Sequence, residues 1–414
     1  MNLYKTSILS GISTLIGMIS GFIITKVIAV YVGPSGMALI GQLQNFINLV
    51  MLSAGGFLKT ALVKFTSEFS NDIEKRNSYW SASIVVISFF NLLSFVILFF
   101  YSSEISTLIL KSDDFEFIFV IFSISLPLFI LNTVLLSILN GLSEIRKFVI
   151  LNIALNITSL FLVTMLSYLF KLNGALIAYV TNQSLVLLFS WLYLKNEPWF
   201  KFANFFSKSD RDAYKGLFGF ALITIASVFS SNISMIYIRD FIINNLSLND
   251  AGYWQGIWTL SQVVLSLVTV AFSTYLLPKL SALKEKNKIS IELIASLKLM
   301  IPLTVFIAVM MYFLREIIIY ILFTNDFISM SSLFLPQMLG NVVKVIGWVF
   351  GYVLVAKGMV KYTVSTEIFF AFTWFLLTKY FIAEFGLVGA CYAYIVNSTL
   401  HAFSMLYLYV YKVK

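Results

Sequence analysis

Runs of apolar residues long enough to cross a lipid bilayer recur along the entire chain. An α-helix needs about 20 mostly apolar residues to span the hydrocarbon layer. Twelve runs meet this requirement, with approximate bounds 6–32, 37–63, 79–101, 117–140, 148–170, 174–194, 216–238, 254–278, 299–323, 333–357, 364–382 and 388–410. The first run contains Lys26 and is too long for a cleaved signal peptide. The pattern therefore predicts an all-α integral membrane protein with twelve transmembrane helices.

The composition supports a membrane protein and argues against redox and metal chemistry. Of 414 residues, 60% are hydrophobic and 11% are charged, whereas a soluble domain carries roughly 45–50% apolar and about 25% charged residues. The single cysteine, Cys391, cannot form an intrachain disulfide, and the single histidine, His401, cannot build a multi-histidine metal site. Because the sequence has no P-loop, nucleophile elbow or HExxH motif, no cofactor, ATP hydrolysis or covalent catalysis is expected.

Basic residues are distributed very unequally between the two sets of connections. Twenty lysines and arginines fall on one set, and only Lys111, Lys171, Arg239, Arg315 and Lys379 fall on the other. Cytoplasmic loops hold lysine and arginine in excess, so the pattern predicts that both termini are cytoplasmic. The net charge of +9 then reflects membrane orientation, and no nucleic-acid partner is expected.

The longest basic connection, residues 195–215, follows the sixth apolar run and divides the chain into two halves of six runs. Two lobes of six helices are the natural interpretation, as in many transporters built from repeats. The predicted division is therefore an N-terminal lobe over residues 1–200 and a C-terminal lobe over residues 201–414.

A polar stripe runs along the tenth predicted helix. Gln337, Asn341, Lys344 and Trp348 are spaced i, i+4, i+7 and i+11, which places them on one helix face. A charge near the centre of a bilayer costs about 2.5–3.5 kcal/mol, so it needs water or a partner. Lys344 therefore indicates a water-filled cavity, or alternatively a buried carboxylate that pairs with it.

Other predicted helices carry polar residues as well. The first helix has Lys26, and the seventh has Arg239 near its outer end. Polar side chains share a face on the second and eighth helices, namely Asn45 and Asn48 on the second and Gln255, Trp258 and Gln262 on the eighth. Polar faces on five helices favour a common aqueous cleft, because lipid cannot satisfy them. Since Lys26, Arg239 and Lys344 are all cationic, an anionic cargo is expected, and a phosphate fits such groups well.

Two titratable residues near this set have alternative interpretations. Glu367, near the start of the eleventh helix, is a candidate for coupling transport to H⁺ or Na⁺, or else an interfacial acid beside Lys361. His401, in the twelfth helix, is interpreted as a buried histidine in preference to a proton relay.

Several strings resemble a known family over nearly the full length. They are Lys26–Gly36, Gly252–Gly256, Phe272–Ser281, Leu314–Glu316, Gln337–Val345 and Val349–Lys357, together with the acid at Glu367. In combination they resemble the Wzx-type flippases of Gram-negative bacteria, in the branch that handles O-antigen and enterobacterial common antigen. In this pattern Lys26, Arg239, Arg315 and Lys344 are matched positions, whereas Asn341 replaces an acid, which leaves the coupling ion open.

The resemblance implies the fold of the multidrug/oligosaccharidyl-lipid/polysaccharide exporter superfamily, which is MATE-like, with two six-helix lobes around a central cleft. It implies an undecaprenyl-pyrophosphate-linked oligosaccharide as substrate, moved from the cytoplasmic to the periplasmic leaflet of the inner membrane. Membrane lipids, a polysaccharide polymerase and a chain-length regulator are the further partners it implies. Together with the cationic residues, it predicts transport by alternating access.

Three alternatives remain at this point. A multidrug or organic-cation antiporter of the same fold would need carboxylates in the cleft, where this sequence offers cations. An O-antigen polymerase or ligase would need a substantial outward loop, but the outward links 102–116 and 239–253 have only fifteen residues each. A scaffold without transport activity would have no use for costly polar residues inside the membrane.

Overall fold

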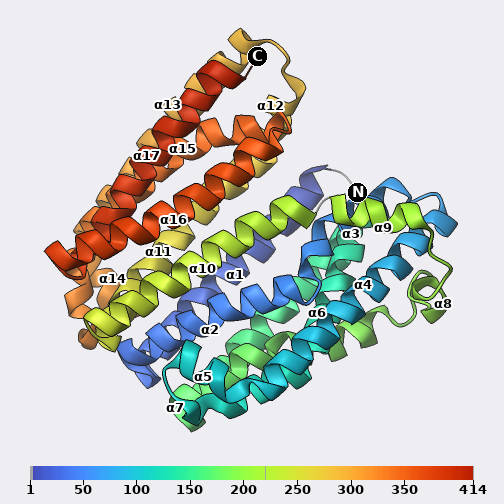
Figure 1. The fold of residues 1–414 in the computed structure, drawn as a ribbon, viewed down its shortest axis with the longest axis horizontal. Helices are drawn as coiled ribbons and strands as arrows, with labels where there is room; N and C mark the ends of the chain where they lie inside the picture. Colours follow the sequence, from blue (N-terminus) through green and yellow to red (C-terminus); the bar gives the residue numbers. More distant parts are fainter. Residues whose placement is uncertain (1–2, 220, 414) are drawn as a thin grey trace. The chain divides into compact units, whose positions relative to one another are not determined.

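The computed structural model describes residues 3–219 and 221–413, and all regular elements in these ranges are helices (Figure 1). The chain divides into two compact units. The N-terminal unit contains the residues up to Val32 and Gln42–Asn232, and the C-terminal unit contains Gly33–Gly41 and the residues from Ile233 onward. Two helices, α2 (Gly33–Ser53) and α10 (Ala221–Asn245), therefore contribute residues to both units.

The N-terminal unit is built around two long helices, α6 and α7. Helix α1 packs along α7, while α3 and α4 pack against α6. Besides its parts of α2 and α10, the unit comprises α1 (Leu3–Tyr31), η1 (Gly56–Leu58), α3 (Lys59–Glu68), α4 (Ile73–Phe100), α5 (Ser102–Leu110), η2 (Asp113–Phe115), α6 (Glu116–Gly141), α7 (Ile145–Leu194), α8 (Phe202–Phe205) and α9 (Arg211–Gly219).

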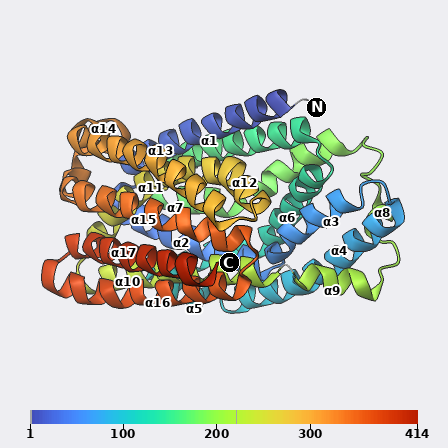
Figure 2. The ribbon, with the colours of Figure 1, turned by 90° about the horizontal axis from the view of Figure 1, so that it is seen from above.

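The C-terminal unit is organised around α15, which packs against α11, α12, α13, α16 and α17. Figure 2 shows α13, α15 and α17 side by side. The elements after α10 are α11 (Leu248–Ala271), the π-helical turn η3 (Phe272–Leu276), α12 (Leu277–Ala282), α13 (Lys286–Phe313), α14 (Arg315–Leu322), η4 (Asn325–Leu333), α15 (Phe334–Ala356), α16 (Val360–Phe385) and α17 (Val388–Lys412).

Glycines on α15 allow α17 to approach closely. Gly340 and Gly347 lie seven residues apart, and their neighbours Tyr394 and His401 on α17 have the same spacing. A Cβ atom at Gly340 would lie 2.4 Å from Cδ1 of Tyr394, so no larger residue fits without a shift. Small residues at helix interfaces permit the close packing that stabilises helix pairs in lipid.

The described residues include eight helices long and apolar enough to cross a membrane, or nine if the bent pair formed by α2 and the segment Gly56–Glu68 counts as one span. The chain is thus a multi-pass membrane protein. Many apolar side chains on these helices are exposed on the protein, as expected for surfaces in contact with lipid.

The predicted span 37–63 is bent in the structure. The expected helix 37–63 ends at Ser53, and the chain then bends by 70°. The bend includes Gly55 at φ 118°, a conformation that glycine adopts without steric cost. The expected helices 148–170 and 174–194 both lie in α7, which has a non-helical backbone at Lys171 (φ 49°, ψ −125°), where the sequence predicts the connection between them.

Candidate functional site

The predicted polar stripe on α15 begins in a buried contact with neighbouring helices. Asn341 donates a hydrogen bond from Nδ2 to Oγ of Ser261 on α11 at 3.2 Å, and its Oδ1 accepts one from the Tyr394 hydroxyl on α17 at 3.3 Å. Gln337, one turn earlier, is fully buried, and its amide makes no hydrogen bond with any residue that the structure describes. This end of the stripe therefore connects three helices and leaves one buried amide unsatisfied.

Lys344 is half-buried one turn after Asn341. It interacts electrostatically with Glu367 on α16 and with His401 on α17, but within the described chain no carboxylate lies within 4 Å of its ammonium group. The sequence left two interpretations of Lys344, a water-filled cavity or a buried carboxylate that pairs with it. The structure has a carboxylate nearby, that of Glu367, but the two groups do not form a direct ion pair. The charge is left without the close partner that a purely structural role requires.

Glu367 and His401 line a common cavity of 200 Å³ in the C-terminal unit. Trp348 of the α15 stripe and Thr269 of α11 also line it. His401 is buried against Gly347 and the ring of Phe370, and its Nδ1 has no hydrogen-bond partner among the described residues. The sequence did not bring these residues together, because Glu367 and His401 lie on different helices and have no common motif.

The alternative interpretation of Glu367, an interfacial acid beside Lys361, predicts a contact between these two side chains. No ion pair connects these two side chains in the part of the chain that the structure covers. Glu367 instead lines the cavity that it shares with His401, and its carboxylate interacts electrostatically with Lys344 without a direct ion pair in the described chain.

Arg239 on α10 is fully buried in the C-terminal unit. Its guanidinium donates a hydrogen bond to the side-chain oxygen of Gln255 on α11 and lies 5.6 Å from the ring of Trp254. Gln255 is itself held against α2, since a Cβ atom at Gly41 would lie 2.6 Å from its Oε1. A hydrogen bond and a cation–π contact both offset part of the cost of burying a charge.

Trp258, the next residue of the predicted α11 stripe, belongs to an aromatic cluster. Its ring centroid lies 5.8 Å from that of Trp254, 5.3 Å from that of Trp374 and 5.6 Å from that of Tyr394. Gln262, one turn further, is exposed. The stripe therefore passes from a packed interior at Gln255 to an accessible surface at Gln262.

The candidate residues of the N-terminal unit are more accessible. Lys26 on α1 and Asn45 on α2 are half-buried. Asn48 is exposed and donates a hydrogen bond to Oδ1 of Asn232 on α10 at 3.2 Å. Because these residues belong to one unit and Arg239 and Lys344 to the other, a cleft shared by all of them stays a prediction.

Arg315 binds the end of the preceding helix. Its Nη1 donates to the carbonyl oxygen of Tyr312 at 2.9 Å, and its Nη2 lies 3.7 Å from Oε1 of Glu316. Adjacent residues on a continuous helix point in different directions and do not pair, so this contact between neighbours is unexpected. The helical path breaks at Leu314, between α13 and α14, so the spacing rules of a continuous helix do not apply there. An exposed pair of this kind contributes about 0–1 kcal/mol.

Comparisons with known proteins agree with this architecture. The profile of a family described as "Polysaccharide biosynthesis protein" matches residues 3–284. The chain is 26% identical over 400 residues to the lipid III flippases of Escherichia coli (strain K12) and Shigella flexneri, covering 95% of each protein.

Solved structures share the fold. The lipid II flippase MurJ in an inward closed conformation aligns with a TM-score of 0.75 and 19% identity, over 98% of this chain and 87% of that one. An inward-facing multidrug resistance MATE family transporter of the MOP superfamily aligns with a TM-score of 0.77 and 15% identity, over 97% and 94%. The all-helical, MATE-like fold expected from the sequence is thereby confirmed.

Proposed function

Because the chain belongs to the polysaccharide biosynthesis protein family, we propose that it is a flippase for an undecaprenyl-pyrophosphate-linked oligosaccharide, an O-antigen or enterobacterial common antigen unit. The proposed direction is from the cytoplasmic to the periplasmic leaflet of the inner membrane, by alternating access. Similarity to the lipid III flippase over 95% of both chains supports a lipid-linked cargo. The fold shared with a lipid II flippase is consistent with it.

The observation that carries the proposal is the state of Lys344. This lysine lies within a membrane helix, is half-buried, and has no carboxylate within 4 Å in the described chain. A cation kept in this position at a cost of about 2.5–3.5 kcal/mol suits a protein that must compensate a negative cargo. In the proposal, Lys344 and Lys26 replace part of the hydration of the pyrophosphate as it crosses the central cleft.

The other candidate residues receive roles that follow from their accessibility. Asn45, Asn48 and Gln262 are accessible polar groups that bind sugar hydroxyls in the proposal, and Trp258 offers a ring for stacking. The buried Arg239, Gln255 and Asn341 join the binding site only if their helices separate during transport, and otherwise hold its walls. Arg315, the first residue of α14, orients the connection from α13 through its hydrogen bond to the carbonyl oxygen of Tyr312.

The topology is part of the proposal. The nine spans counted above become twelve if α7 crosses twice, on either side of Lys171, and if α10 and α17 also cross. Both termini are then on the same side, which the lysine distribution places in the cytoplasm.

Ion coupling is assigned to Glu367. Its carboxylate lines the cavity next to His401 and interacts with Lys344, so binding of H⁺ or Na⁺ there changes the field at the lysine. A multidrug or organic-cation antiporter is less well supported, because Lys344 would repel a cationic cargo from the same region.

The experiment uses cells from which the gene for this protein has been deleted and which express one variant of the protein in its place. Lys344→Ala is expected to leave the lipid-linked repeat unit on the cytoplasmic leaflet, whereas Lys344→Arg, which keeps the charge, should retain activity. Lys361→Ala is the control, since this lysine is exposed and lies outside the cavity. Full translocation by Lys344→Ala would remove the residue from the proposal.

A further inference from the structure

An apolar pocket of 470 Å³ lies within the N-terminal unit, far in sequence from the residues proposed to handle the cargo. Helices α4, α6 and α7 form its walls, with Leu131 and Leu135 on α6 and Leu188 and Trp191 on α7. The segment after α7, residues 195–210, closes it with four phenylalanines, two of which, Phe202 and Phe206, are exposed. Volume and lining fall within the range of pockets that bind compact apolar ligands, about 300–1,000 Å³.

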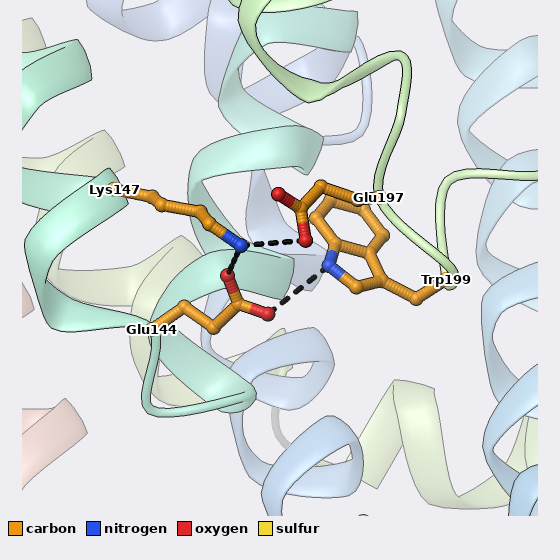
Figure 3. A network of polar contacts seen from close by, with 4 residues as sticks. All are labelled: Glu144, Lys147, Glu197 and Trp199. Atoms are coloured by element: carbon orange, nitrogen blue, oxygen red, sulfur yellow. Dashed lines mark hydrogen bonds and ion pairs between the residues drawn. The ribbon is translucent and has the colours of Figure 1, made fainter.

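The segment that closes the pocket, which we call the connector (residues 195–210), is held in place by polar contacts. Lys147 forms ion pairs with Glu144 and with Glu197, the latter at 2.6 Å, and the indole of Trp199 donates to Glu144 at 3.2 Å (Figure 3). Glu197 of the connector and Glu144 of the α6–α7 turn thus share Lys147 as their counter-charge.

Contacts with α4 fix the rest of the connector. Phe205 stacks on the buried ring of Trp80, with centroids 5.3 Å apart. The backbone N–H of Ser207 donates to Oγ of Ser81 at 2.8 Å, and Asn77 donates to the side chain of Asn204 at 3.0 Å. Because the connector is fixed on both sides, the pocket is formed without a ligand, which lowers the cost of filling it.

Two lysines of the connector neighbour residues that line the pocket, and neither forms an ion pair with the residues that the structure describes. The ammonium of Lys195 lies 6.0 Å from the ring of Trp191, which lines the pocket. Lys201 is exposed between the lining residues Phe200 and Phe202, and its side chain makes no ion pair or hydrogen bond with the described residues. Trp191 lies within one turn of the end of α7, where an apolar helix gives way to polar chain, as tryptophans do at membrane interfaces.

We propose that this pocket binds one hydrocarbon chain of an anionic glycerophospholipid, with the lipid phosphate held between Lys195 and Lys201. An apolar pocket next to two lysines at the end of a membrane helix matches a ligand that is apolar at one end and anionic at the other. A long polyprenyl chain is a poorer match, since only a short part of it fits into 470 Å³. This site does not depend on the proposed cargo.

The test measures lipid binding to the full-length protein purified in detergent, by native mass spectrometry during titration with phosphatidylglycerol or phosphatidylcholine. The wild type should prefer phosphatidylglycerol. Basic residues contribute about 1 kcal/mol each at an anionic lipid surface, so Lys195→Ala with Lys201→Ala should weaken phosphatidylglycerol binding about 30-fold. Lys208→Ala, an exposed lysine of the same connector, should have no such effect.

A second pair of variants tests the pocket itself. Leu131→Trp should fill it and reduce lipid binding, whereas Leu128→Trp should not, because Leu128 does not line the pocket. The two leucines are matched in exposure, 42% and 43%, and lie one turn apart on α6. Equal binding of the two phospholipids, or equal binding by both tryptophan variants, would overturn the proposal. Displacement of phosphatidylglycerol by an equal concentration of polyprenyl phosphate would also overturn it, in favour of the cargo tail.

Discussion

The imidazole of His401 on α17 lies directly against Gly347 on α15, so that a Cβ atom at residue 347 would stand 2.7 Å from Nδ1. Four residues later on the same helix, a Cβ at Gly351 would be 3.7 Å from the sulfur of Met405, an ordinary contact distance. His401 can therefore keep its place in the wall of the cavity that it shares with Glu367 only because residue 347 has no side chain.

This difference leads to a paired prediction for the two glycines. Gly347→Ala should destabilise the protein by about 1–3 kcal/mol, because a methyl group must displace the imidazole or separate α15 from α17. Gly351→Ala should be neutral or stabilising, since alanine favours a helix by about 1 kcal/mol over glycine. Thermal unfolding in detergent measures both, and similar unfolding midpoints for the two variants would contradict the packing described here.

The buried amide of Gln337 gives a prediction that separates stability from transport. Gln337→Leu removes an amide without hydrogen bonds in the described chain, and burying such a group costs about 1–3 kcal/mol. We therefore expect a higher unfolding temperature. Asn341→Leu should have the opposite effect, because it removes the bonds to Ser261 and Tyr394. If Gln337 binds cargo during transport, Gln337→Leu will combine increased stability with reduced flipping. A lower unfolding temperature for Gln337→Leu would show that its amide is satisfied.

Arg239 and Gln255 should be energetically coupled. A hydrogen bond to a charged group contributes about 1.5–3 kcal/mol, so a double-mutant cycle with Arg239→Met and Gln255→Leu should show a coupling of that size. Arg239→Lys is expected to be destabilising as well, because an ammonium group does not reproduce the planar contacts of guanidinium. Additive effects of the two single substitutions on the free energy of unfolding would mean that the hydrogen bond is not important for stability.

The connector should loosen when Lys147 is removed. Lys147→Met leaves Glu144 and Glu197 facing each other without a counter-charge, and like charges repel. Trypsin should then cleave faster after Lys201 and Lys208, as seen by the time course of the fragments. Lys75→Met is the control, since its pair with Asp72 is exposed and 3.8 Å long. Unchanged cleavage in Lys147→Met would show that aromatic packing alone holds the connector.

Local features of the sequence predicted most helices but few of the contacts between them. Helical spacing placed Gln337, Asn341 and Lys344 on one face, because that depends only on residues within three turns. The bend at Gly55 was missed, since the apolar run continues through it and only the backbone conformation changes. The break near Lys171 was predicted, because one apolar run ends at residue 170 and the next begins at residue 174. The burial of Arg239, and the cavity shared by Glu367 and His401, depend on the packing of helices distant in sequence, which no local pattern reveals.

The sequence did contain a signal for the contact between α15 and α17. Gly340 and Gly347 are seven residues apart, and so are Tyr394 and His401, the residues that pack against them.

The most direct measurement is a flipping assay in liposomes. The liposomes contain the purified protein and a lipid-linked oligosaccharide, and the oligosaccharide is extracted from cells that lack the gene for this protein. A membrane-impermeant glycosidase added outside digests only the sugars exposed on the outer leaflet. With the wild-type protein, digestion should extend to the sugars that started on the inner leaflet, while liposomes with Lys344→Ala should stop at the protein-free level. The same extent of digestion with and without the wild-type protein would contradict the proposal that this chain is a flippase.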